Sequence, residues 1–301
     1  MPGTTTASTG PPTGDLSTAA RATVTPRRAV VLLVVAAITV GVVVWLLAWL
    51  LVTGPVAAAG AGLVVAVAVA ATAWWGSVPL ALRLAGGHPA HPVDHARLLN
   101  LVEGLGANAG VTAPSVLVRV DPALNALTLG RSSRQATLVV TSGLLEELNR
   151  IELEAVVAHE LSHIRSDDLL AATLAVPLFG IWRRSALTAA QSGPSAILAR
   201  LLVPVSALAG LGLRLSVDPH REEQADIAGV RLTRYPPALM SALEKVRQRG
   251  PVVDGGNLSP ATAHLWLASP LPPSPRRLAW LTELYETHPG LQERIEALRE
   301  L

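Results

Sequence analysis

The sequence predicts a mostly α-helical protein with a small β-sheet, an α+β fold that begins with a transmembrane helical hairpin. Three observations lead to this prediction. Two apolar runs without a charged residue lie near the start, short segments of strand type follow them, and the last third is polar with a helical pattern. Half of the residues are hydrophobic, mostly Ala, Val and Leu in runs, and this is typical of helices that face lipid.

Composition and charge exclude several classes of function. The formal net charge is +2, and the arginines are scattered or flank apolar segments instead of gathering into one basic stripe with aromatic side chains. We therefore expect no nucleic-acid partner. Because the chain contains no cysteine, it has neither a thiolate nucleophile nor a cysteine-ligated metal, and any metal must be bound by His, Asp or Glu.

Residues 1–28 are interpreted as a disordered cytoplasmic tail, because small and polar residues dominate them and offer little apolar surface to bury. Residues 29–82 contain no charged side chain. A turn at Thr53-Gly54-Pro55 divides this stretch into runs at about 29–52 and 56–75, each long enough to cross a hydrocarbon core of roughly 30 Å. A cleaved signal peptide is the alternative, but its apolar core would be about half as long and would leave the second run unexplained.

Flanking arginines predict the orientation of this hairpin. Arg21, Arg27 and Arg28 precede the first run and Arg83 follows the second, whereas the turn between the runs is uncharged. The positive-inside rule therefore places the N-terminus and the domain after the hairpin in the cytoplasm. We expect an integral, multi-pass protein of the plasma membrane that contacts the lipid bilayer.

Residues 83–301 are expected to form one domain that carries the chemistry. Helices are predicted at 96–107, 144–148 and from 151 onward, and strands at 115–120, 127–129 and 137–141. An apolar helical insert, 169–217, interrupts the domain in two stretches at 169–182 and 196–217. The first is short and the second contains Arg200, Pro204 and Arg214. The pattern leaves open whether they are a third and a fourth membrane segment, interfacial helices or buried core helices.

The pattern His159-Glu160-x-x-His163 lies on a predicted helix. Histidines four residues apart lie one turn apart on the same face, so both imidazoles can bind one tetrahedral Zn²⁺. Glu160 lies about 100° around the helix, where it can reach a water on the metal without becoming a ligand. The pattern predicts one zinc ion per chain, with Glu160 as the general base. The alternative is that both histidines are ordinary helix residues.

A second acidic segment can supply the third protein ligand that a catalytic zinc requires. Glu222 is the best candidate, because Glu222 and Asp226 lie one helical turn apart. Glu222 can then bind the metal while Asp226 accepts a hydrogen bond from the outer nitrogen of a ligand histidine. A solvated acidic helix face is the alternative interpretation of this segment.

These motifs occur in an order that resembles one family. The chain is similar to the HtpX-like membrane metallopeptidases at 139–145, at 152–168 around the two histidines, and at Glu222-x-x-Ala225-Asp226. Two further pieces fit the same family, Asn125-Ala126 ahead of the histidines and His288-Pro289 with Arg294-Ile295 near the end. The resemblance covers most of the chain from about His95 onward. The chain departs from the family at Leu127, where an aromatic residue is usual.

The resemblance implies a gluzincin-type core, cytoplasmic proteolysis, and two further helices inserted between the zinc-ligand segments. It also implies roles outside the metal shell. Asn125 and Ala126 would bind substrate by pairing with its backbone, a mode that tolerates many side-chain sequences. His288 would stabilise the oxyanion, and Arg294 would orient this imidazole or the substrate carbonyl.

The sequence thus predicts a membrane-anchored zinc endopeptidase that cleaves membrane or membrane-proximal polypeptides in protein quality control. A dedicated signalling or maturation protease is the second interpretation, and a catalytically silent membrane scaffold is the third. His88, His91 and His95 are interpreted as part of a hydrated linker after the hairpin, with a regulatory metal site as the alternative. His220 is either a partner of the metal site or an exposed side chain.

Overall fold

A computed structural model describes residues 26–51, 54–166, 168–191, 193–218, 220–251, 259–271 and 278–301. The expected disordered tail up to residue 25, and Thr53 of the predicted turn, lie outside these ranges. Within them the protein is mostly helical with one small sheet, as the sequence predicts.

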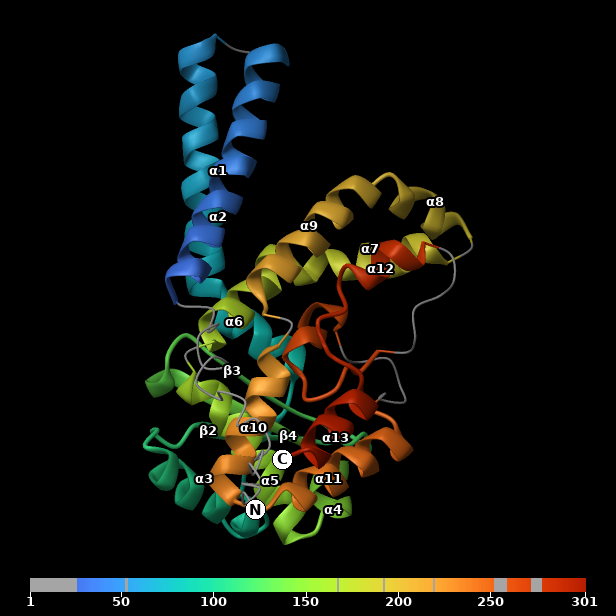
Figure 1. The fold of residues 1–301 in the computed structure, drawn as a ribbon. Helices are drawn as coiled ribbons and strands as arrows, with labels where there is room; N and C mark the ends of the chain where they lie inside the picture. Colours follow the sequence, from blue (N-terminus) through green and yellow to red (C-terminus); the bar gives the residue numbers. More distant parts are fainter. Residues whose placement is uncertain are drawn as a thin grey trace, which may run out of the picture.

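The predicted hairpin consists of α1 (Pro26–Leu51) and α2 (Pro55–Ala85), which project from the rest of the molecule (Figure 1). Both helices are long and apolar enough to cross a membrane. They pack closely, because a Cβ on Gly62 would lie 2.6 Å from the Gly41 carbonyl oxygen and 2.9 Å from Trp45 Cβ. Small residues at such a crossing let two backbones approach each other in lipid.

The predicted second run, at about 56–75, lies within α2, and this helix continues beyond it to Ala85. Its 31 residues extend over roughly 46 Å, which exceeds a hydrocarbon core of roughly 30 Å. Ser77, Ala81 and Ala85 in the last turns are buried. One face of this last part of the helix packs against residues of β3 and α6.

One four-stranded sheet lies in the domain. Its strands follow the order β1 (His88–Pro89), β2 (Ser115–Arg119), β4 (Ala136–Thr141) and β3 (Ala126–Gly130). β2 and β4 are parallel, whereas β3 pairs antiparallel with β4 and forms one edge of the sheet. Three strands confirm the predictions. β1 has only two residues and therefore shows no sequence pattern.

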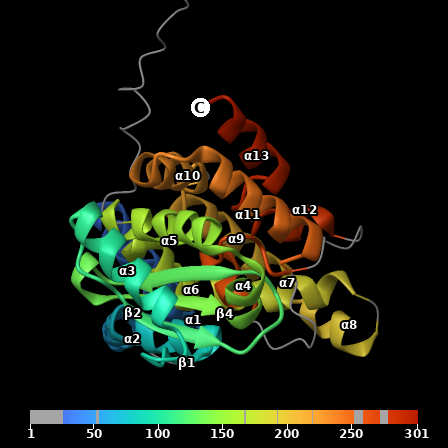
Figure 2. The same ribbon diagram turned by 90° about the horizontal axis from the view of Figure 1, so that it is seen from below.

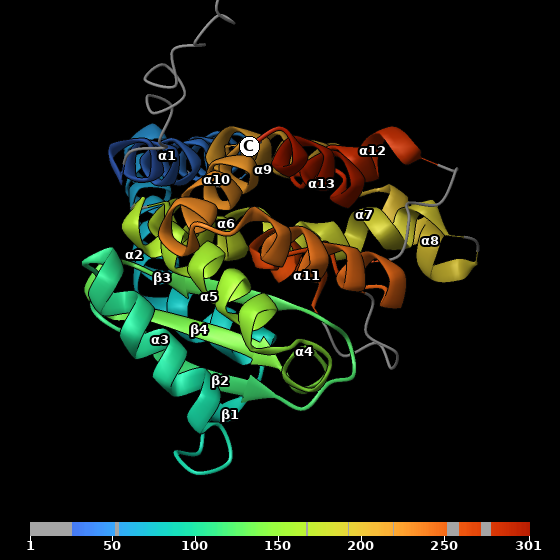
Figure 3. The same cartoon turned by 60° about the horizontal axis from the view of Figure 1, so that its bottom comes forward.

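Helices cover both faces of this sheet (Figures 2 and 3). α3 (Ala96–Ala109) and α5 (Arg150–Arg165) lie on one face, where Leu138 and Val140 join the main core. Leu127 and Leu129 point to the other face and pack with residues of α2 and α6 (Leu169–Leu178). This alternation has the period of two expected of a strand. β3 therefore lies buried between α5 and the base of the hairpin.

A capping box fixes the start of α5, which follows α4 (Ser142–Glu147). The Asn149 side chain accepts hydrogen bonds from the N–H groups of Ile151 and Glu152, and the Glu152 carboxylate accepts one from the N–H of Asn149. These bonds satisfy donors that a helix otherwise leaves unpaired. The helix then runs without interruption past both histidines of the motif.

The apolar insert forms an arm that leaves the domain beside the base of the hairpin (Figure 1). It contains α6, η3 (Gly180–Trp182), α7 (Arg183–Ala190), α8 (Pro194–Arg200) and α9 (Val203–Ser216). The ten residues of α6 cover about 15 Å, half of a hydrocarbon core. α8 and the helix that begins at Val203 are long and apolar enough for a membrane span only when they are taken together. The angle between the two helices at the break is 67°.

Arg183 in the insert is buried, whereas its neighbour Arg184 is exposed. The Arg183 guanidinium donates to the Tyr285 carbonyl oxygen at 2.8 Å and to the Glu286 carboxylate at 2.5 Å. The protein itself therefore compensates the charge of Arg183. The contact also ties the insert to the segment that carries His288.

The polar C-terminal part is helical, as predicted. α10 (Arg221–Thr233) and α11 (Pro236–Arg249) pack against α5, and α13 (Leu291–Arg299) packs against α11 (Figure 3). η4 (Pro260–Leu265) and α12 (Ala279–Glu283) contact the insert, and a short η2 (Ser133–Gln135) joins β3 to β4. The sequence did not predict that the residues directly after η4 run along β3.

Candidate metal centre

His159, His163 and Glu222 direct one ligand atom each to a common point. The histidines lie one turn apart on α5, and Glu222 lies in the first turn of α10. The three ligand atoms all lie within 4.8 Å of one another, with His159 Nε2 3.4 Å and His163 Nε2 3.7 Å from the Glu222 carboxylate oxygens. Ligands at about 2.0–2.1 Å from a tetrahedral ion are separated by roughly 3.4 Å. The spacing therefore fits one metal ion.

Two of these ligand atoms form no hydrogen bond. His159 Nε2 and Glu222 Oε2 are buried and form no hydrogen bond with any residue that the structure describes. An unsatisfied polar atom inside a protein costs about 1–3 kcal/mol. A bound cation would satisfy both atoms at once.

The formal charges around the ligands also fit a divalent cation. Four carboxylates and two guanidiniums gather here, from Glu160, Asp168, Glu222, Asp226, Arg221 and Arg294. All are buried except Asp168, whose side chain is 12% exposed. With neutral imidazoles these groups leave two negative charges. One divalent ion balances them, and buried charges are stable only when they are compensated in this way.

Without a metal, a proton on His159 supplies part of that compensation. Burial lowers the pKa of His159, but its contacts with Asp226 and Glu222 outweigh burial and raise the pKa to about 9. Burial alone would raise the pKa of the Glu222 carboxyl, yet His159, His163 and Arg221 hold it well below its usual range. Burial likewise opposes ionisation of Asp226, and the charge of Arg294 lowers its pKa.

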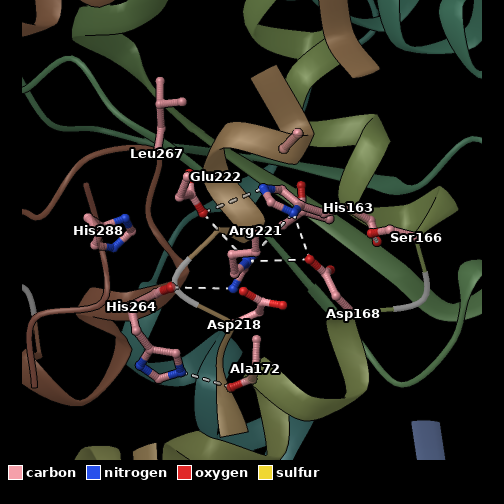
Figure 4. A network of polar contacts seen from close by, with 12 residues as sticks. His163, Ser166, Asp168, Ala172, Asp218, Arg221, Glu222, His264, Leu267 and His288 are labelled. Carbon is pink, nitrogen blue, oxygen red and sulfur yellow. Dashed lines mark hydrogen bonds and ion pairs between the residues drawn. The ribbon is translucent and has the colours of Figure 1, made fainter. Parts of the chain in front are cut away.

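Each histidine is held by a carboxylate on its outer nitrogen. His159 Nδ1 lies 2.8 Å from Asp226 Oδ1. His163 Nδ1 lies 3.0 Å from Asp168 Oδ2 (Figure 4). Such contacts fix the orientation of the rings and leave both Nε2 atoms free for a metal. The sequence pointed to Asp226 but missed Asp168. The available signal was an acid five residues beyond the second histidine, just before α6.

Two arginines hold these carboxylates in place. Arg294 donates to both oxygens of Asp226 at 2.7 Å, and its Nη1 lies 3.4 Å from Glu222. Arg221 Nε lies 3.4 Å from Asp168 and 3.5 Å from Glu222 (Figure 4). The sequence linked Arg294 to the oxyanion and did not single out Arg221. In this structure both side chains serve the carboxylates that hold the histidines.

Glu160 lies beside the metal ligands and is not one of the converging three. Its Oε2 accepts a hydrogen bond of 2.6 Å from Thr128 Oγ1 on β3. This bond orients the carboxylate and makes β3 the strand in direct contact with the expected general base. The sequence did not single out Thr128, because a threonine within a strand carries no distinctive pattern.

His288 lies near Glu222, on the segment between α12 and α13 (Figure 4). Its Nε2 is 3.0 Å from the Ala263 carbonyl oxygen, which can only accept, so Nε2 carries the ring proton. Nδ1 is buried without a hydrogen-bond partner in the described ranges. Burial lowers the pKa of His288 to about 4, so the imidazole is neutral at pH 7.

Asn125 and Ala126 are paired with the chain itself. Asn125 Nδ2 donates to the Ala268 carbonyl oxygen at 2.8 Å, and Asn125 Oδ1 accepts from the Ala268 N–H at 3.2 Å. The Ala126 carbonyl oxygen accepts from the Leu267 N–H at 2.7 Å. Next to them, Leu127 and Trp266 form an antiparallel bridge. We call residues 259–268 the strap.

The remaining histidines lie outside the converging group. His220 is exposed, with Nδ1 3.4 Å from Glu223, and His88 and His91 are exposed after the hairpin.

A pocket of about 450 Å³ opens beside the metal centre. Its lining includes His220, Glu223, Glu286, Thr287, His288 and Arg294.

Comparison with known proteins gives consistent matches. Peptidase family M48 matches residues 92–301. The chain is 34% identical over 254 residues to a protease HtpX homolog of Tropheryma whipplei (strain TW08/27), with 79% of this chain and 84% of that protein covered. It is 34% identical over 263 residues to a protease HtpX homolog of Acidiphilium cryptum (strain JF-5), with 80% and 88% covered. No solved structure matches the chain.

We expect Gly229→Ala to weaken metal binding. Ser162 Oγ lies 3.3 Å from the Ala225 carbonyl oxygen where α5 meets α10, and a Cβ on Gly229 would lie 2.9 Å from His159 N. The atoms of α5 that this Cβ would meet belong to the backbone and cannot move aside. α10 must therefore shift and carry Glu222 away from the histidines. Overpacking of this kind costs about 1–3 kcal/mol. The measurement is the zinc content and melting temperature of the purified protein.

Gly104→Ala on α3 is the matched control, because nothing lies within 4 Å of a Cβ at that position. This variant should keep its metal and its melting temperature. Full zinc occupancy in Gly229→Ala would contradict the close packing of the two helices as the basis of the site.

Proposed function

This chain belongs to peptidase family M48, and from this membership we propose that it is a membrane-anchored, zinc-dependent endopeptidase. The family makes it a metalloprotease, and the convergence of His159, His163 and Glu222 is the observation that supports zinc. Two imidazoles and one carboxylate, with a fourth position left for water or substrate, are typical of catalytic zinc sites. One zinc ion per chain is proposed.

Glu160 is the general base of the proposed reaction. Zinc bound at this site would lower the pKa of a water molecule to roughly 7 and polarise the scissile carbonyl. Glu160, oriented by Thr128, takes the proton from the attacking water and later gives it to the leaving amine as the peptide bond breaks. Proton transfer of this kind contributes about 10² to 10⁴ in rate.

Asp168, Asp226 and Arg294 are proposed as positioning residues. The two carboxylates keep the outer nitrogens of the histidines protonated, so that each Nε2 is available to the metal. Arg294 acts on His159 through Asp226, because its guanidinium donates to both oxygens of that carboxylate. A rigid arrangement of this kind avoids reorganisation during the reaction.

His288 is proposed to stabilise the oxyanion when substrate is bound. Attack on a peptide bond places negative charge on the carbonyl oxygen, and a donor beside the metal stabilises this charge more in the transition state than in the ground state. The only proton on neutral His288 lies on Nε2, which bonds the Ala263 carbonyl oxygen in this structure. Donation to substrate therefore requires Nε2 to leave that partner.

The proposed substrates are membrane or membrane-proximal polypeptides in protein quality control. The hairpin supports this choice, because it holds the site close to the bilayer. Recognition of substrate backbone by Asn125 and Ala126 would accept many sequences, as unfolded proteins require. Exposed apolar side chains on α8 and α9, such as Ile197, Leu198 and Leu208, would contact lipid.

Glu160→Gln should keep about one zinc per chain and lose nearly all cleavage of an unfolded protein such as casein. The reason is that Glu160 transfers the proton but does not bind the metal. Glu222→Ala should lose both the metal and the activity, because two imidazoles alone hold zinc poorly. Zinc analysis and a casein assay on both variants test this. Loss of metal from the first variant and full occupancy in the second would reverse the two assignments.

His288→Ala should keep zinc and fold but lose on the order of 10² in kcat, with a smaller effect on KM. This is the size expected when one oxyanion donor is removed. Steady-state kinetics on zinc-loaded protein provide the measurement. A near-normal kcat would leave His288 with only its structural bond to Ala263.

A reporter fused after Leu301 should lie in the cytoplasm, and so should one inserted near His95. Both ends of the hairpin must lie on the same side, and the flanking arginines favour the cytoplasmic side. Accessibility of the two reporters in intact and permeabilised cells is the measurement. An external signal near His95 would overturn the proposed orientation.

A further inference from the structure

The structure leaves the reacting groups out of reach of a polypeptide. His159, Glu160, His163 and Glu222 are each at most 3% exposed. A substrate must bring its scissile carbonyl to within roughly 3–3.5 Å of the groups that attack it. Part of the protein must therefore move before cleavage can occur.

The strap lies where an extended substrate has to bind. β3 is the edge strand of the sheet, and its Thr128 bonds Glu160. A peptide that presents its scissile bond to Glu160 would pair with this edge, because an edge strand offers unpaired backbone groups. In this structure the Ala126 carbonyl oxygen is taken by Leu267, and both polar groups of the Asn125 amide are taken by Ala268. Strap and substrate cannot use the same edge together.

The strap also occupies donors that point into the site. His288 Nε2 bonds the Ala263 carbonyl oxygen at 3.0 Å, and Arg294 Nη1 donates to the Leu267 carbonyl oxygen at 2.7 Å. A bound substrate would present carbonyl oxygens of the same kind. Since the Ala263 carbonyl oxygen of the strap accepts the His288 Nε2–H, the closed state also occupies the proposed oxyanion donor.

We infer that the strap is an internal substrate mimic that closes the peptidase, and that an extended segment of a polypeptide substrate displaces it from β3. This inference rests on the proposed function. Displacement frees the Asn125 amide, the Ala126 carbonyl oxygen and the His288 Nε2–H in one movement. The enzyme then becomes competent only when a chain able to replace the strap is present.

The anchors of the strap come from the membrane-proximal elements. The Trp266 side chain packs with Ala81 and Ala85 of α2 and with Val176 of α6. His264 Nε2 donates to the Ala172 carbonyl oxygen of α6 at 2.8 Å. Substrate therefore competes with contacts made by the hairpin and the insert, and not only with the bonds along β3.

A reversible disulfide between strap and edge strand tests the inference. Opposite residues of an antiparallel pair have Cβ atoms about 4.5–5.5 Å apart, close to the roughly 3.5–4.5 Å of a disulfide. The double variant Leu127→Cys, Trp266→Cys places cysteines at the bridged pair. Because the chain has no cysteine of its own, only this disulfide can form within it. The full chain, purified in detergent and loaded with zinc, is assayed on casein after oxidation and after reduction.

We expect the oxidised form to lose casein cleavage and the reduced form to regain it, with equal zinc content and melting behaviour in both. The two single-cysteine variants, treated in the same way, should show no such dependence. Equal cleavage by the oxidised and reduced forms would overturn the inference, since substrate would then reach the metal by another route, such as the pocket beside His220 and Glu223. Failure of the unmodified, zinc-loaded protein to cleave any unfolded protein would instead count against the proposed function.

Leu127 and Trp266 are both fully buried, so replacing them can prevent folding. If the double variant does not fold, the variant His264→Leu tests the inference instead. The change removes the bond that holds the strap to α6 without touching the metal centre. Per zinc-loaded molecule, this variant should cleave casein faster than the parent protein, as expected when a competing contact is weakened. An equal or lower rate would overturn the inference, because a purely structural bond gives no gain when it is lost.

Discussion

The contact between α5 and α10 is the constraint on which the rest of the site depends. A Cβ on Gly229 would collide with the backbone of His159, so the two helices are as close as their backbones allow. This approach places Glu222 against two imidazoles and leaves formally two uncompensated negative charges in a buried space. Charges in such a place have to be balanced. The arrangement of these groups therefore suits a divalent cation, held by His159, His163 and Glu222.

Arg294 and His288 each contact both the candidate metal centre and the strap that closes it. Arg294 holds Asp226, which orients His159, and it also donates to the carbonyl oxygen of Leu267 in the strap. His288 faces Glu222 and bonds Ala263 of the strap. Burial strengthens the electrostatic interactions of the metal centre because the local dielectric is low. It also keeps substrate out, so a protease of this construction needs a segment that can be replaced by its substrate.

Local periodicity was sufficient to predict most elements of the fold. The helical turn spacing gave His159, His163, Glu222 and Asp226, and all four meet in the structure. The residues that sequence reasoning missed share a different property. Thr128 and Asp168 reach Glu160 and His163 only through contacts made after folding, and the one local signal was the position of Asp168 five residues beyond His163. The strap was missed for a related reason, since pairing between 126 and 267 bridges a long stretch of chain and leaves no local pattern.

The hairpin and the insert also hold parts of the candidate site in place. The C-terminal turns of α2 and the helix α6 of the insert pack around the Trp266 side chain. Gly180 of η3 packs against Ala261 of the strap. Arg183 of the insert donates hydrogen bonds to the Tyr285 carbonyl oxygen and to the Glu286 carboxylate, which lie just before His288. A buried guanidinium is costly unless its partners stay in place, so this link favours one fixed position of the His288 segment. The strap is held instead by hydrogen bonds from several separate elements and by the packing of Trp266. A rigid His288 segment beside a replaceable strap is the combination that lets substrate enter without disturbing the groups that act on it.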